Sequence, residues 1–402
     1  ISDKINLTYI QNRLNSIIVI EFGSIVIVNI NDALHAGNKG IIDYYCKKIL
    51  ERWKNIDYVF CGFGGASYFP NCFHLPQKKD KDIAEAREIY FLNNFFTIIS
   101  KLEPQTAIPF AADIALLHPD IRWINETRIN RELMKDYYSS IYPNSQTTIV
   151  TMYPGDTLSG HTIISESPYR VKFIDSSLQH LIKEQYSKEI ENIEQKPHLP
   201  LQNANLLLEK LEKHIIERRK QLIKRNPESK TVFNNLYFNI CLTDIINKPN
   251  FSVKLKKDKV YIEKVNYISE ENLFDIHLKN EILNYSLNSI WGGDALTIGY
   301  GAQIYFNSED AVEYTLKYNI LSLFTNHPSL QDLDKFSSIR GIINILGNEL
   351  YTDYIWKKVT GRSKMSILSN SNKVDYINYH HLWINSDKCE ICKICNLPEV
   401  LY

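Results

Sequence analysis

The sequence predicts a layered α/β domain followed by a smaller α+β unit. Over residues 1–160, short apolar strands alternate with amphipathic helices, and from residue 231 the chain becomes rich in β-branched and aromatic residues. Between these regions lies a polar, helical stretch. At 402 residues, the chain exceeds one typical domain. We therefore expect an α/β domain at 1–160, a helical connector at 161–230, a small α+β domain at 231–334 and a C-terminal segment at 335–402.

The elements of the first domain follow from hydrophobic periodicity. Residues 17–22 and 24–31 predict two strands that turn at Gly23. Apolar residues at helical spacing predict helices, and short apolar runs predict further strands. The predicted helices are 39–54, 80–101 and 131–142, and the predicted strands are 58–61, 106–110 and 147–152. This alternation is typical of a sheet covered by helices.

In the second half, the apolar residues from Leu206 to Leu222 predict one long helix that Pro227 ends. Strands are expected at 232–241, 251–255 and 260–265, with a turn at 256–259. Helices are expected at 278–290 and 308–325.

Composition excludes some classes of partner. The 46 basic and 46 acidic residues cancel, so bulk charge does not favour a nucleic acid. The chain has no run of about 18 apolar residues, so we expect no membrane span. Seven cysteines, an odd number with one tight cluster, favour a reducing compartment, which predicts a cytoplasmic protein.

Asp32 and His35 directly follow the strand 24–31, which is rich in β-branched residues. A carboxylate and an imidazole at the carboxyl end of a buried strand lie where open α/β sheets bind ligands. These two residues are therefore candidate metal ligands, with Asp32 also a catalytic candidate that could bridge two metals. The alternative is an ordinary turn, because Asn-Asp after a strand is favourable turn chemistry.

Four short motifs carry a resemblance to a known family. They are Asn-Ile-Asn-Asp32, Gly62-Phe-Gly-Gly-Ala-Ser67 with Tyr68-Phe-Pro70, Ile108-Pro-Phe-Ala-Ala112 and Tyr153-Pro-Gly-Asp156. In this order the chain resembles, over residues 15–160, the metallo-β-lactamase-fold domain of the CMP-N-acetylneuraminate hydroxylase group. The resemblance implies an αβ/βα sandwich with a dinuclear iron or zinc cleft, in which Asp32 matches the metal-bridging aspartate.

The chain departs from that family in its histidines. The family's His-x-His-x-Asp-His motif occurs nowhere in the sequence, and Phe110 and Ala111 stand where hydrolases of this fold have their last histidine ligand. The chain begins at Ile1, in a segment with the composition of a sheet interior. We therefore expect that additional N-terminal sequence or a companion chain completes the sandwich and supplies histidine ligands. The alternative is that the site is inactive in isolation.

The glycine-rich loop that ends at Ser67 permits two interpretations. Glycines allow a ligand to approach the backbone closely, and Ser67 could donate a hydrogen bond, which makes it a candidate catalytic residue in a cleft. A dinucleotide-binding loop would have to open a helix at once, and Pro70 and Pro76 argue against that.

Cys389, Cys392 and Cys395 form a C-x-x-C-x-x-C cluster near the C-terminus. Thiolates at this spacing can converge on one metal, which predicts an Fe–S cluster or a zinc site. The fourth ligand could come from His380 or His381, or from elsewhere in the fold, where Cys46, Cys61, Cys72 and Cys241 are candidates. The alternative is a tail of reduced thiols.

Three functions follow from these observations. The first is a metal-dependent oxidoreductase, a hydroxylase in which iron activates oxygen, acting on a small polar substrate that is sugar-nucleotide-like. The second is a metal-dependent hydrolase in which a bridging hydroxide held at Asp32 attacks the substrate. The third is a non-catalytic subunit or scaffold that a partner chain completes. The unit at 231–334 faintly resembles sterol-carrier modules, and the alternative is a plain structural module.

Overall fold

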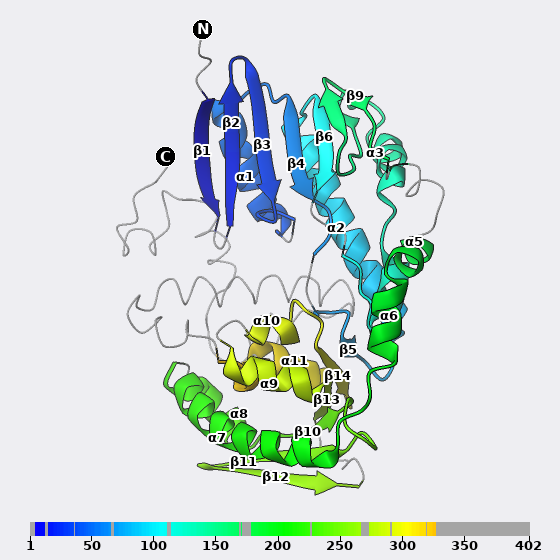
Figure 1. Ribbon diagram of the computed structural model, residues 1–402. Coiled ribbons are helices and arrows are strands. Elements are labelled where there is room, and N and C mark those ends of the chain that lie inside the picture. Colours follow the sequence, from blue (N-terminus) through cyan, green and yellow to red (C-terminus); the bar gives the residue numbers. More distant parts are fainter. Residues whose placement is uncertain are drawn as a thin grey trace.

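A computed structural model of the chain shows mixed α/β structure. The residues that it describes are 5–12, 15–35, 37–65, 68–110, 114–168, 170, 178–225, 227–266, 273–289, 292–318 and 320–326. They form two six-stranded sheets, here called sheet A and sheet B, and one two-stranded sheet (Figure 1). The α/β class is therefore as predicted. Ser67 and the cluster Cys389, Cys392 and Cys395 lie outside the described residues, so their roles stay predictions.

Sheet A contains the predicted strands of the first domain. In spatial order it consists of β1 (Ile5–Asn12), β2 (Asn15–Phe22), β3 (Ile25–Asn31), β4 (Tyr58–Gly62), β6 (Thr106–Phe110) and β7 (Thr148–Ile149). The first three strands are antiparallel, and β3, β4, β6 and β7 are parallel. Gly23 forms the β2–β3 turn at φ +58°, a conformation that favours glycine. β1 was not among the predicted strands, and β7 is shorter than the predicted 147–152.

Three helices cover one face of sheet A. They are α1 (Lys39–Arg52), α2 (Asp80–Leu102) and α3 (Met134–Ile141), the last preceded by the 3₁₀ turn η2 (Arg131–Leu133). The Asn38 side chain caps α1 by accepting a hydrogen bond from Ile41 N at 3.0 Å. Ile42 and Ile49 of α1 are buried in one core with Val28 and Ile30 of β3. This face of the sheet is therefore covered by helices and buried in an apolar core.

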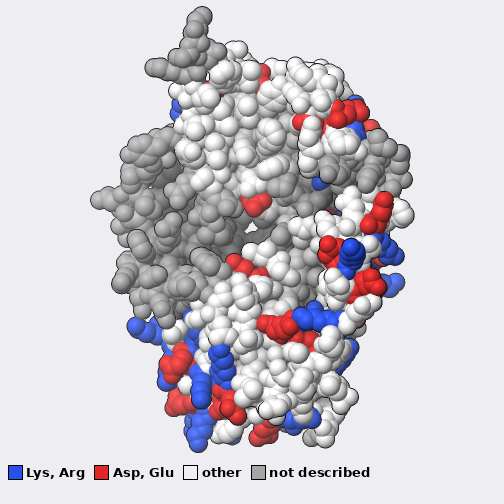
Figure 2. Space-filling view, in the orientation of Figure 1, with Lys and Arg blue, Asp and Glu red and all other residues white. Residues whose placement is uncertain are grey.

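The opposite face of sheet A is apolar but exposed among the described residues. In β1 the side chains alternate, with Thr8 and Ile10 buried while Leu7 and Tyr9 are about half exposed. The pairing places Ile5, Phe22 and Ile25 in one row across three strands, and all three are exposed. In Figure 1 the strands lie in front of α1 and α2, and Figure 2 shows that the corresponding upper surface is mostly uncharged. We call this surface the open face.

Sheet B forms the second unit. Its strands in spatial order are β12 (Lys259–Val265), β11 (Asn250–Lys256), β10 (Tyr237–Leu242), β13 (Phe274–Leu278), β14 (Ala302–Phe306) and β5 (Phe73–His74). The helices α7 (Leu201–Arg225), α9 (Asn280–Asn288) and α11 (Glu309–Lys317) contribute to its core. The β11–β12 hairpin and α7 confirm the sequence prediction, whereas β13, β14 and β5 were missed.

Several boundaries differ from those that the sequence predicts. The predicted strand 232–241 begins only at Tyr237, because the short helix α8 (Lys230–Phe233) precedes it. The predicted helix 308–325 divides into α11 and the 3₁₀ helix η4 (Ile320–Phe324). The remaining elements are β8 (Thr157–Ser159), β9 (Thr162–Ser165), α5 (Leu178–Gln185), α6 (Ser187–Glu194), α10 (Gly292–Leu296), η1 (Arg122–Thr127) and η3 (Pro227–Ser229).

Helix α2 belongs to the cores of both sheets. Ile83, near its N-terminal end, and Phe91, at its midpoint, are buried with the side chains of sheet B. Phe95 and Ile99, in its C-terminal half, are buried with those of sheet A. β5, which precedes α2 in the chain, pairs in parallel with β14. The two units therefore share one continuous helix and one strand pairing. Within the described part of the chain, no helix is long and apolar enough to cross a membrane.

Candidate functional site

The predicted pair Asp32 and His35 lies at the carboxyl edge of sheet A, as expected. Asn31 ends β3 at φ +43°, beside an irregularity in the pairing with β4, and the chain then turns back through Ala33 N to Ile30 O. Asp32 is exposed. Asx residues tolerate this left-handed conformation, so the turn interpretation explains the local backbone.

The His35 ring is held in one orientation. Its Nδ1 lies 2.7 Å from the Asp32 carbonyl oxygen, and because a carbonyl can only accept, Nδ1 carries the proton. The ring stacks on Phe91 with centroids 5.1 Å apart. Burial lowers the pKa of His35, and the Asp32 charge opposes this shift only in part. His35 is therefore neutral at pH 7, with Nε2 as its acceptor nitrogen.

The described residues do not by themselves fit a dinuclear metal centre. Asp32 and His35 offer one carboxylate and one imidazole nitrogen, and no group of three or more His, Cys, Asp or Glu side chains within the described ranges could hold a metal ion. Phe110, exposed at the end of β6, offers no ligand where the resemblance places a histidine. Cys46, Cys61, Cys72 and Cys241 are buried free thiols, and burial raises their pKa.

The glycine-rich loop approaches protein atoms closely. A Cβ on Gly62 would lie 2.9 Å from the Asn31 carbonyl oxygen, and one on Gly65 would lie 2.8 Å from the Phe91 ring. These glycines let the loop pack against β3 and α2, which explains them without a ligand. The expectation that they admit a ligand stays a prediction.

A buried ionic cluster was missed by sequence reasoning. Arg87 and Glu88 lie in the middle of α2, and Arg128 directly follows η1; their side chains are 0–3% exposed. Nη1 of Arg87 and Nη1 of Arg128 donate to the same Glu88 Oε1 at 2.8 and 3.0 Å. Arg87 Nη2 also donates to the Gly65 carbonyl oxygen. The spacing of apolar residues could have indicated the burial of Arg87. Arg87 lies four residues from both Ile83 and Phe91, and residues at this spacing share one face of a helix.

The Pro-Gly-Asp motif forms a second buried ionic junction. Asp156 Oδ1 accepts from Ser167 N at 2.6 Å, and Oδ2 accepts from Tyr153 N at 2.8 Å and from Arg170 Nη2 at 2.6 Å. The guanidinium carbons of Arg131 and Arg170 lie 5.5 and 5.1 Å from the centroid of the Tyr153 ring. Asp156 thus joins the end of sheet A to the following segment, and its role here is structural.

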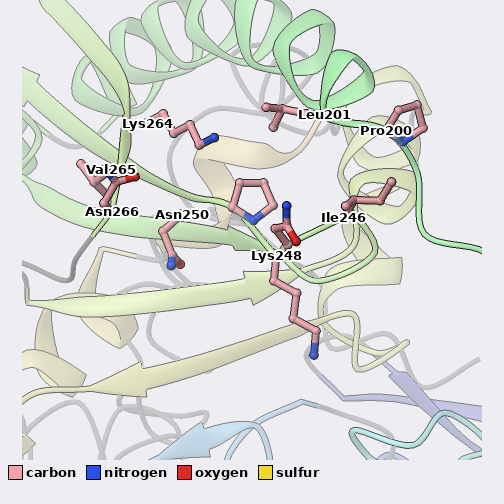
Figure 3. Close-up of a pocket in the computed structure, with 10 residues that line it drawn as sticks. Pro200, Leu201, Ile246, Lys248, Asn250, Lys264, Val265 and Asn266 are labelled. Atoms are coloured by element: carbon pink, nitrogen blue, oxygen red, sulfur yellow. The ribbon is translucent and has the colours of Figure 1, made fainter.

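A cavity of about 360 Å³ lies at the β10–β11 turn of sheet B (Figure 3). Its lining includes Pro200, Leu201, Ile246, Lys248, Asn250 and Lys264. Figure 3 shows that Lys248 extends away from Lys264, so the two ammonium groups do not converge on one point. This cavity therefore lacks a built polar site.

The space between sheet B and its helices is filled by apolar side chains.

Three comparisons bear on identity, and each has the same result. No protein-family model, no curated protein and no solved structure matches the chain. The candidate site is consequently the carboxyl edge of sheet A, defined by its geometry: an exposed Asp32 and a half-buried His35, with the cluster of Arg87, Glu88 and Arg128 buried nearby.

Proposed function

We propose that this chain is a subunit of a composite site, a scaffold that a companion chain completes by packing an apolar sheet onto the open face. The observation that carries the proposal is the open face itself. Leu7, Ile20 and Ile27 occupy neighbouring positions on β1, β2 and β3, and the row of Ile5, Phe22 and Ile25 lies beside them.

The energetic argument is one of area. Contiguous apolar patches on monomers are small, and larger ones mark interaction surfaces. Burying one such side chain fully contributes about 1.5–3 kcal/mol. Two sheets pack face to face at about 10 Å, with their side chains interdigitated. An apolar sheet face therefore favours a second apolar layer, and we propose that this layer is another sheet.

Completion of the sandwich would also bring further side chains to the carboxyl edge of sheet A. Asp32 is exposed at the end of β3, and Phe110 lies exposed at the corresponding end of β6. A layer packed on the open face would place its own side chains beside this edge. The companion chain would thus contribute the ligands that the described residues lack.

The first prediction tests the open face with the isolated chain. In the absence of a companion chain, the open face of one copy can pack against the open face of another copy. We expect concentration-dependent association, measured by sedimentation equilibrium. Leu7→Lys with Ile20→Lys should weaken association at least about tenfold, because each lysine would have to be desolvated in the interface. Leu206→Lys is the control, since Leu206 is also exposed, at 65% against 51% for Leu7, but lies on α7 and not on sheet A.

Two outcomes would contradict association through the open face. A chain that stays monomeric at about 100 μM, and that binds a hydrophobic dye no better than the double-lysine variant, would contradict an apolar docking face. Association that is equally weakened by Leu206→Lys would contradict its location on sheet A.

A second candidate function is the metal-dependent enzyme that the motif order resembles, an oxidoreductase or a hydrolase. The observation that favours it is the exposed carboxylate of Asp32 at a parallel strand end, where a metal can be reached. In this proposal Asp32 and His35 Nε2 belong to the metal site, and the metal would activate oxygen or a hydroxide once the other ligands are supplied.

The second prediction concerns Asp32 in the completed assembly. Asp32→Asn is expected to remove most of the bound iron or zinc while leaving the unfolding midpoint within about 0.5 kcal/mol, because an exposed turn residue contributes little packing. Elemental analysis and urea unfolding measure the two quantities. Asp310→Asn, an exposed aspartate of α11, is the control. Unchanged metal content in Asp32→Asn would show that Asp32 is only a turn residue.

A further inference from the structure

The cluster of Arg87, Glu88 and Arg128 places three charged side chains in the protein interior. The guanidinium groups of Arg87 and Arg128 share one carboxylate oxygen of Glu88, and all three side chains are nearly fully buried. A buried N–H group without a hydrogen-bond partner is costly, because the interior does not replace the water that solvated it. A donor of this cluster that is left without an acceptor therefore favours a ligand that supplies one.

The hydrogen-bonding deficit is located on one edge of Arg128. Its Nη1 donates to Glu88, whereas its Nε and Nη2 are buried and have no hydrogen-bond partner among the described residues. These two N–H groups point in the same direction along one side of the planar guanidinium. That edge matches two oxygens of a carboxylate or a phosphate. The missing partner is therefore a bidentate oxyanion.

The position of the cluster supports a ligand. It lies on α2 where the helix passes from the core of sheet B to the core of sheet A, and binding sites often occupy such junctions. Arg87 connects it to the carboxyl edge: it donates to the Gly65 carbonyl oxygen and lies 5.1 Å from the Phe91 ring, on which His35 stacks.

We propose that the Nε–Nη2 edge of Arg128 binds a small molecule through a phosphate or carboxylate group, with Glu88 fixing the orientation of the guanidinium through Nη1. Glu88 is a positioning residue, and Arg128 makes the contact. The proposal does not depend on a companion chain, because every residue in it belongs to this chain.

The third prediction tests the site directly on the full chain. Inorganic phosphate and acetate, each titrated at constant ionic strength in potassium chloride, serve as separate probes in thermal unfolding and calorimetric titration. At least one of them should raise the Tm saturably, because a ligand that binds only the folded state stabilises it by mass action. A response to phosphate alone identifies a phosphate ligand, and a response to acetate alone a carboxylate.

Arg128→Lys keeps the charge but removes the bidentate edge, so it should weaken binding at least tenfold. Arg122→Lys is the matched control, because Nε and Nη2 of Arg122 already donate to the Leu117 carbonyl oxygen. If Arg128→Lys fails to fold, the Nε–H signals of arginine in the ¹⁵N-labelled wild-type chain give a second readout, and one signal should shift saturably. The proposal is wrong if neither probe changes the Tm or an arginine signal beyond potassium chloride, or if both lysine variants weaken binding equally.

Discussion

Replacing Glu88 with alanine is expected to destabilise the fold by about 3–5 kcal/mol, the typical cost of removing one member of a buried ion pair. Glu88 Oε1 accepts hydrogen bonds from both Arg87 and Arg128. Without it, two buried guanidinium groups face one another with no carboxylate between them. Because α2 belongs to both cores, the loss should affect the whole structure and not one unit.

Urea unfolding followed by circular dichroism measures this loss. Glu85→Ala is the control: Glu85 lies on the same helix, but its side chain is exposed, and its pairing with Lys81 at 3.9 Å contributes little. We expect that control to change the free energy of unfolding by less than about 0.5 kcal/mol. Glu88→Gln keeps an acceptor oxygen but removes the negative charge. Its loss in free energy of unfolding therefore measures the contribution of that charge. Equal stabilities of Glu88→Ala and Glu85→Ala would show that the cluster is not buried as described.

Asp156→Asn is the second large effect, with an expected loss of about 2–3 kcal/mol at pH 7 from weakened charge-assisted hydrogen bonds. Burial alone would raise the pKa of Asp156. The N–H groups of Tyr153 and Ser167 and the Arg170 guanidinium outweigh burial, so the pKa of this carboxyl lies below its ordinary value of 3.8.

The direction of the pH dependence follows from this shift. A carboxyl with a depressed folded-state pKa adds stability above its unfolded-state pKa near 3.8, and this stability is lost as the pH falls through the folded-state pKa. The gap between wild type and Asp156→Asn should therefore narrow as the pH falls from 5 to below 3.8. Urea unfolding across that range measures it, with Asp310→Asn as control. A gap that is constant with pH would contradict the ionised, hydrogen-bonded Asp156.

The local elements were predicted well where the chemistry is local. Gly23 between two β-branched runs predicted the β2–β3 hairpin, and apolar spacing predicted α1 and α2 to within two residues at each end. β5 was missed because it has only two residues and forms through its pairing with β14. The pairing of Phe73 with Ile304 joins residues more than 200 positions apart, and no local pattern encodes it.

The candidate site was predicted in part. Asp32 and His35 were found because a polar pair that directly follows an apolar strand can be recognised in the sequence itself. Arg128 was not identified from the sequence, because its place in the buried cluster depends on its hydrogen bond to Glu88, 40 residues earlier in the chain. Ser67, Cys389, Cys392 and Cys395 remain predictions.

By itself, the sequence determined the α/β class, the order of most strands and helices, and the location of Asp32 and His35 at a strand end, because backbone propensity and apolar periodicity are properties of neighbouring residues. Only the tertiary structure decided which face of sheet A is covered, that α2 joins two cores, and that two arginines converge on Glu88. These features depend on contacts between distant segments, whose free energy comes from burial and charge pairing, which a single stretch of sequence does not specify.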